Sequence, residues 1–301
     1  MKILKITGSS LLLSSALIIT GCSSDDGGGV GKATVPKDAI PLTAANAETV
    51  ISKSFTATDV ILAKGTSATT TIPSEVVDQV LDGIRSNFRS ATGADMVSGV
   101  AFNYTRDCAT GQPDAIEGDL NTKTDKGNET ATDDGSGGGT YKASGTSSMV
   151  ECDEGNGVTL DGKVSYTWSE VWGYDANQDY FSNYSSKVSG SVTMTPNGST
   201  TPIDLTNLVM NREHNGVTND YTITKMQYTY NPGTDGFALN MTTTIEGNDN
   251  ACNPTAGVVE ISGANKSKVR ITYSDTGVLV EVDENGDGTF AEVTTTFFAC
   301  V

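Results

Sequence analysis

The chain has 301 residues, with Lys+Arg 19 against Asp+Glu 37, a net charge of −18 and a single histidine. A strongly acidic chain repels phosphate backbones, so we exclude nucleic acid as a partner. One histidine argues against histidine-based zinc sites and proton relays. Although only 36% of the residues are apolar, a chain of this length can still bury a sizeable core.

Residues 1–21 predict an export signal. Lys2 and Lys5 precede a short apolar run, LLLSSALII at 11–19, which is too short to span a membrane. The run ends in ITGC at 19–22, which resembles the lipobox of bacterial lipoproteins. This resemblance implies that Cys22 becomes the N-terminus and carries a diacylglycerol and an acyl chain such as palmitate, a durable membrane anchor. Ser23, rather than Asp, implies the outer membrane, with the face of that membrane left open.

Residues 22–38 are rich in Gly, Ser and Asp, which predicts a flexible tether. Removal of the leader takes away two lysines and no acid, so the net charge changes from −18 to −20. An even number of cysteines in the exported part favours disulfides. Three pairings are possible. We favour the two that each close a sequence-local unit, Cys108–Cys152 and Cys252–Cys300. Each such loop contributes roughly 4 kcal/mol.

Residues 39–92 predict a helical segment with two helices. The first, at 42–60, is rich in Ala, and Thr43 is a candidate N-cap. The second, at 74–90, follows Pro73 and repeats its apolar residues as one stripe. We expect this stripe to pack on a sheet.

Residues 93–301 predict an antiparallel β-domain. Segments rich in Thr, Val and Tyr alternate with period two and are separated by Asn-Gly, Pro-Gly and Asp-Gly turns, so we expect about ten strands. The polar, glycine-rich stretch 112–139 predicts a mobile acidic loop. The expected fold is therefore mainly β: a large twisted antiparallel meander sheet, as a sandwich or partly closed barrel, with two N-terminal helices packed on it.

The last fifty residues carry a family resemblance. A strand ends in Gly263-Ala264-Asn265, another strand follows, and a hairpin surrounds Asn285-Gly286-Asp287-Gly288. This order resembles the C-terminal unit of a group of uncharacterised lipoproteins from Gram-negative bacteria. The resemblance implies the β-rich fold and the lipid anchor, and it implies no activity.

The same hairpin is a candidate calcium site. Asp283, Asn285 and Asp287 place oxygen atoms at alternate positions, as in an EF-hand loop, and Thr289 offers its carbonyl. The twelfth position, however, is Thr294 rather than Glu. A plain hairpin is therefore our first interpretation, and a hairpin with a weakly bound calcium ion is the second.

Aromatic residues gather between residues 168 and 184. Exposed rings beside Asn, Asp and Gln suit a sugar-binding platform, whereas strands also use aromatic residues to pack across a sheet. We favour the structural interpretation and keep the ligand-binding one. The candidate ligand-binding residues are Trp168, Trp172, Tyr174 and Tyr180.

Catalytic motifs are absent from the sequence: it has no nucleophile elbow, no zinc-protease motif and no phosphate-binding loop. His214 lies in the polar stretch NREHNG at 211–216, where we expect a solvent-exposed loop. The leading interpretation is a non-enzymatic outer-membrane lipoprotein with an envelope or surface binding or structural role. Its expected partners are the membrane and a polysaccharide or envelope protein. A carbohydrate- or matrix-binding module is the alternative, and a hydrolase with paired carboxylates is the third.

Overall fold

The computed structural model describes residues 33–55, 57–58, 96–106, 111–112, 114–124, 138–153, 158–174, 180–196, 198–251, 253–295 and 298. In parts of the first five strands only the backbone is described. The second expected helix, 74–90, lies outside these residues, so a pair of N-terminal helices stays a prediction.

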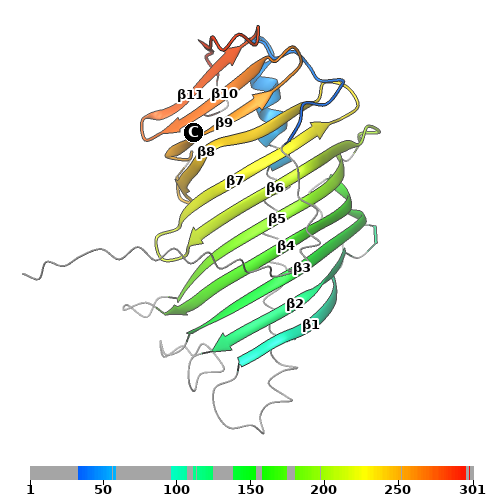
Figure 1. Ribbon diagram of the computed structural model, residues 1–301, viewed down its shortest axis with the longest axis vertical. Coiled ribbons are helices and arrows are strands. Elements are labelled where there is room, and N and C mark those ends of the chain that lie inside the picture. The colour runs from blue at the N-terminus through cyan, green and yellow to red at the C-terminus, as the bar shows by residue number, and fades with distance from the viewer. Residues whose placement is uncertain are drawn as a thin grey trace, which may run out of the picture.

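One antiparallel sheet dominates the protein, which confirms the mainly β prediction. Its twelve strands pair in sequence order, and Figure 1 shows that they form one long twisted sheet. The strands are β1 Met96–Arg106, β2 Asp114–Thr124, β3 Gly138–Asp153, β4 Val158–Tyr174, β5 Tyr180–Pro196, β6 Ile203–Asn215, β7 Asp220–Asn231, β8 Phe237–Asn248, β9 Ala256–Ser262, β10 Lys268–Ser274, β11 Gly277–Asp283 and β12 Ala291–Glu292.

The sheet stays open, which corrects the expected sandwich or partly closed barrel. Each hairpin adds its strand to the same growing edge, so β1 and β12 are the two edge strands and do not pair with each other. The described strands also form a single sheet rather than two packed layers.

Strand β2 corrects a second expectation, because it occupies part of the stretch 112–139 that the composition assigned to a loop. Its residues are paired in register with β1 on one side and with β3 on the other. A polar sequence can form a strand when both of its edges are hydrogen-bonded, since the ladder then satisfies its backbone groups.

Alternation along each strand separates an apolar inner face from a polar outer face. On β10, Val269, Ile271 and Tyr273 are buried, whereas the residues between them are only partly buried. The same period continues on β9 with Val259 and Ile261. Because directly paired residues share a face, this alternation joins the strands into one continuous core.

A helix covers part of the inner face. Residues 47–55 and 57–58 are helical and lie behind β8–β10 in Figure 1. The buried side chains recur with helical spacing, and the Tyr228 hydroxyl on β7 donates to the Ser54 carbonyl at 2.6 Å. The buried residues of this stripe are Ala47, Val50, Ile51, Ser54, Ala57 and Thr58. Within the described residues, no helix is long and apolar enough to cross a membrane.

The start of this helix differs from the expected one. The helical conformation begins at Ala47, after a turn, and the Thr43 carbonyl accepts from the Ala47 N–H at 3.0 Å. The Asn46 side chain accepts from the Thr43 N–H at 2.9 Å, and Glu284 accepts from the Ala44 N–H at 2.7 Å. A carboxylate at this end is favourable because the helix dipole is positive there.

Residues 33–42 form an N-terminal strap that crosses the rim of the sheet. This corrects the predicted tether boundary, because the contacts with the sheet begin at residue 33 rather than after residue 38. On the outer face, Thr34 exchanges hydrogen bonds with the Thr229 hydroxyl at 3.2 and 2.9 Å. Farther along, Ile40 donates to the Gly236 carbonyl, and the Leu42 N–H donates to the buried Ser267 hydroxyl at 2.8 Å.

The strap explains why the rim carries glycines. A Cβ on Gly263 would lie 2.3 Å from the Ile40 carbonyl oxygen and 2.6 Å from Leu42 Cγ. A Cβ on Gly236 would lie 2.6 Å from Pro36 Cγ. The Gly-Ala-Asn turn therefore receives the strap, because only glycine lets the two backbones approach this closely.

We expect Gly263→Ala to lower the free energy of unfolding by about 1–3 kcal/mol, because the added methyl displaces the strap. Denaturation in urea measures this loss, and limited proteolysis should then cleave within residues 33–42. Gly288→Asn on the same rim is the control, because its site has open space and asparagine tolerates a positive φ. Equal stability of the two variants would contradict the role of the strap.

Candidate functional site

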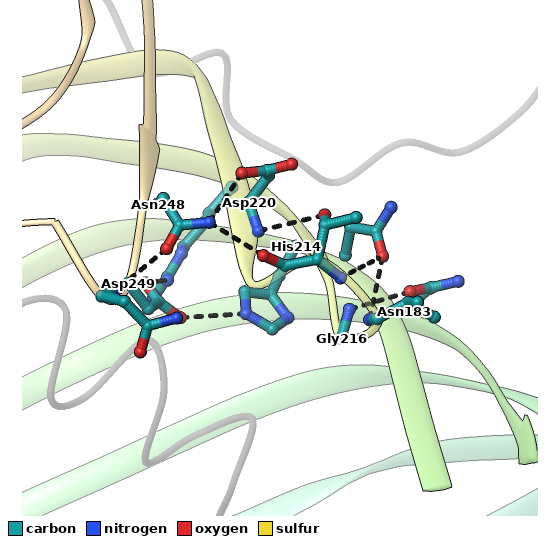
Figure 2. A network of polar contacts seen from close by, with 11 residues as sticks. Asn183, His214, Gly216, Asp220, Asn248 and Asp249 are labelled. Carbon is teal, nitrogen blue, oxygen red and sulfur yellow. Dashed lines mark hydrogen bonds and ion pairs between the residues drawn. The ribbon is translucent and has the colours of Figure 1, made fainter. Parts of the chain in front are cut away.

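Among the described residues, a network of polar contacts joins the β6–β7 turn to the β8–β9 loop, at the end of the sheet opposite the strap (Figure 2). Asp249 bridges two side chains of β6. Its Oδ1 lies 2.9 Å from Arg212 Nη2, and its Oδ2 lies 2.9 Å from His214 Nε2. The carboxylate only accepts, so His214 Nε2 donates. Asp249 thereby holds the β8–β9 loop against β6. We call the contact of Asp249 with Arg212 and His214 the Asp249 clasp.

Aromatic rings enclose this clasp. The rings of His214 and Tyr184 stack with centroids 4.9 Å apart, and the Arg212 guanidinium lies 5.0 Å from the Tyr221 ring centroid. Tyr184, His214 and Tyr221 are directly paired across β5, β6 and β7, so they share the inner face. Burial raises the pKa of Tyr221 although Arg212 lowers it, so the phenol stays protonated at neutral pH.

Amide side chains form a second layer around the β6–β7 turn. Asn248 Nδ2 donates to the Thr218 carbonyl and to Asp220 Oδ1, each at 2.8 Å, and Asn183 accepts from the Gly216 N–H at 2.9 Å. The hydrogen bonds from Asn248 and Thr218 lower the pKa of Asp220. These contacts satisfy the turn and join β5, β7 and β8 at one end.

The position of His214 corrects the sequence expectation. It lies on β6 rather than in a loop, and its side chain is only 12% exposed because Tyr184 and Asp249 cover it. Two buried nitrogens, Arg212 Nε and His214 Nδ1, have no hydrogen-bond partner within the described part of the chain. A general base must reach its substrate, and Nδ1 is enclosed. This arrangement favours a structural clasp over catalysis.

No pattern in the sequence predicts the contact of Asp249 with Arg212 and His214. Asp249 is 37 residues from Arg212 and 35 from His214. The spacing of Arg212 and His214 by two residues does place them on one face of a strand. Nothing in the local pattern identifies which of many carboxylates comes to them.

A second ion-pair cluster lies on the outer face near the C-terminal edge. Glu260 Oε1 lies 2.9 Å from Arg270 Nη2, and Glu260 Oε2 lies 3.2 Å from Lys268 Nζ. Burial alone would raise the pKa of Glu260, but hydrogen bonds from Arg270 and Lys268 bring it below its ordinary value. The Arg270 guanidinium also lies 3.7 Å from the Phe290 ring centroid. Glu260 therefore holds both cations against the outer face of the sheet.

In the candidate calcium loop, side-chain oxygens already accept hydrogen bonds from the N–H groups of the loop. The buried Asp283 carboxylate accepts from the N–H groups of Gly286 and Gly288, each at 2.8 Å, and of Asp287 at 3.2 Å. Asp287 Oδ1 accepts from the Thr289 N–H at 2.8 Å, and Gly286 has φ +70. Burial raises the pKa of Asp283, but the loop N–H groups more than offset that and hold the pKa below its usual range.

Calcium binding at this loop stays a prediction. The Asp283 oxygens already accept from the backbone, and Asn285 follows on the turn. Over the residues that the structure describes, no group of three or more His, Cys, Asp or Glu side chains is placed to hold a metal ion. The loop geometry supports the plain hairpin.

The predicted aromatic platform is described only along its backbone. Tyr174 pairs with Tyr180 at the end of the β4–β5 hairpin, Trp172 pairs with Ser182, and Trp168 pairs with the buried Ser186. This hairpin lies at the same end of the sheet as the β6–β7 turn, because Tyr184 near the start of β5 pairs with His214 at the end of β6 (Figure 1). Ligand binding by these four residues stays a prediction.

Of the cysteines, Cys152 is described. It is fully buried on β3 and disulfide-bonded. Cys22, Cys108, Cys252 and Cys300 lie outside the described residues, so the pairings Cys108–Cys152 and Cys252–Cys300 stay predictions.

The outer face of the central strands has an unusual composition. Every second residue over 142–148 of β3, 163–169 of β4 and 185–195 of β5 is Ser, Thr or Lys. None of these positions is buried, whereas the residues Val164, Tyr166 and Val188 between them are. We name this set the hydroxyl–lysine panel. It contains no acid, although the chain has 37 Asp and Glu residues.

Comparison with known proteins adds no assignment: no protein family, curated protein or solved structure matches the chain. The resemblance to Gram-negative lipoproteins therefore stays a prediction, and the site must be interpreted from its own geometry.

We expect Asp249→Asn to lower the free energy of unfolding by about 1–3 kcal/mol, because Arg212 and His214 are mostly buried and lose their charged acceptor. Urea denaturation measures the change. Asp275→Asn removes the same charge from an exposed turn and serves as control. If both variants unfold at the same urea concentration, the clasp contributes nothing.

The lowered pKa of Asp283 predicts an acid-dependent stability. A carboxyl with a lower pKa in the folded state stabilises the protein above its unfolded pKa, about 3.9. This contribution is lost as the pH falls from about 4 through the folded pKa. We expect Asp283→Asn to lower the melting temperature at pH 7 and to reduce the difference from wild type below pH 4. Asp287→Asn should retain the wild-type profile, and a parallel loss at all pH values would contradict the assignment.

Proposed function

We propose that this protein is a lipid-anchored outer-membrane lipoprotein whose β-domain has a non-enzymatic binding role in the envelope. The observation that carries the proposal is the contrast between the carboxylates, which are held by contacts within the fold, and the residues of the hydroxyl–lysine panel. The contacts described above occupy Asp249, Glu260 and Asp283 within the fold. In the hydroxyl–lysine panel, by contrast, no residue is buried along three long strands.

The lipobox supports the anchor. Ten residues separate Cys22 from Ala33, where the strap reaches the sheet. The eleven Cα–Cα steps from Cys22 to Ala33 span at most about 40 Å when extended. If Cys22 is lipidated, the strap end of the sheet stays within this distance of the bilayer surface. The opposite end, with the β4–β5 hairpin and the Asp249 clasp, then points away from the anchor.

The alternative is a carbohydrate- or matrix-binding module that uses the aromatic segment. Its supporting observation is that the β4–β5 hairpin end adjoins amide side chains, among them Asn183 and Asn215. Amides and aromatic rings together suit sugar recognition. We place a hydrolase last because Glu260 and Asp283 are held by hydrogen bonds within the fold.

We expect Cys22→Ser to abolish labelling by radioactive palmitate and to remove the protein from the outer-membrane fraction, because the thiol is the proposed attachment atom. Ser24→Ala, two residues away, should retain labelling and fractionation. Unchanged fractionation of Cys22→Ser would contradict the proposal.

A further inference from the structure

The inner face of β4–β6 is buried, although the described helix lies over another part of the sheet. Tyr166, Val188 and Met210 pair directly across β4, β5 and β6, and they are 2%, 3% and 4% exposed. Leu205 on β6 is fully buried. A sheet buries an apolar face to this degree only when a second layer packs on it. The helix at 47–58 lies behind β8–β10, so the layer over β4 and β5 has another source (Figure 1).

The chain that follows this helix must cross from β7 to the far edge of the sheet. Thr58, the last described residue of the helix, lies on the inner face, where its hydroxyl is 3.1 Å from the Tyr228 hydroxyl on β7. The next strand in the chain is the edge strand β1, which begins at Met96. Six inter-strand steps of about 4.8 Å separate β7 from β1, a distance of about 29 Å. Residues 59–95, which lie outside the described residues, make this connection.

One part of the connection has the sequence pattern of a covering helix. Within 74–90 the apolar residues recur with helical spacing and form one stripe, whereas Glu75 and Asp82 fall on the opposite side. A helix over this range is about 26 Å long, which is close to the width that the chain has to cross. The stripe consists of Val76, Val77, Val80, Leu81, Ile84 and Phe88.

The occupant of this face is a segment of the same chain rather than a second copy. The connection is joined to the protein at Thr58 and at Met96, so its effective concentration at the face exceeds that of a free partner. Two copies would bring together two chains that each carry a net charge of −18. The apolar stripe and the apolar row on the sheet also contain no charge, so their contact buries no unpaired ion.

We propose that residues 74–90 form an amphipathic helix that packs its apolar stripe on the inner face of β4–β6. Because the chain arrives from β7 and departs to β1, the N-terminal end of this helix lies toward β6 and its C-terminal end lies toward β3. The inner face is then an internal contact of the protein. The binding surface of the envelope role proposed above would therefore lie on the outer face or at the ends of the sheet. The packing itself does not depend on that role.

Photocrosslinking in the full chain tests the position and direction of the segment. The photoreactive residue p-benzoylphenylalanine replaces Phe88, and peptide mass spectrometry after irradiation identifies the residues that it contacts. We expect crosslinks within one chain to peptides of β3 or β4. The same residue in place of Ser86, on the opposite side of the helix, should give no crosslink to the sheet. Crosslinks between two chains, crosslinks to other strands, or no crosslink from position 88 would overturn the proposal.

A matched pair of variants tests the energetics of the contact. Ile84→Asp places a carboxylate on the apolar stripe, so we expect a lower urea midpoint and increased fluorescence of a dye that binds exposed apolar surface. Ser86→Asp adds the same charge on the opposite side and should match the parent protein. If Ile84→Asp does not fold, Ile84→Ala against Ser86→Ala makes the same comparison. Equal urea midpoints within a pair would overturn the packing of the stripe, whereas the palmitate labelling that tests the anchor would not change.

Discussion

The passage of the N-terminal strap over the rim is the contact on which the rest of the architecture depends. The strap reaches the inner face because Gly236 and Gly263 leave room for its backbone. It then delivers the helix to the apolar side of β7–β11, where Tyr228 holds Ser54. Over the described residues, the outer face of β3–β5 has no such cover and carries an extended polar surface.

Different side chains satisfy the backbone polar groups at the two ends of the sheet. Each end must satisfy backbone groups where strands reverse. At the strap end, the Asp283 carboxylate gathers the N–H groups of its own loop, and Glu284 reaches the first turn of the helix. At the other end, amides and the Asp249 carboxylate connect neighbouring loops. Carboxylates thus satisfy polar groups where the strands turn at both ends, whereas the outward positions over 142–148, 163–169 and 185–195 are Ser, Thr or Lys.

The sequence predicted the features that depend on local pattern. Alternation identified the strands and the antiparallel order, and Asn285-Gly286 identified a hairpin. Prediction from the sequence failed where the contacting residue lies far away in the chain. The polar strand β2 is stabilised by ladders on both sides rather than by its own composition. His214 is covered by a ring and a carboxylate that no local rule could assign. Whether successive hairpins continue one sheet or fold into two depends on the accumulated twist, which no short window of sequence contains.

The long sequence separations at the strap have a consequence for how the chain matures. Thr34 contacts Thr229, 195 residues away, Leu42 contacts Ser267, 225 residues away, and Ala44 contacts Glu284, 240 residues away. The hairpins, in contrast, join neighbours in sequence and form by local closure. Because a chain is synthesised from its N-terminus, the strap and the helix have no docking site until the last strands have been made. The segment that is made first is therefore the last to take its place, and the fold is completed only when the whole sheet is present.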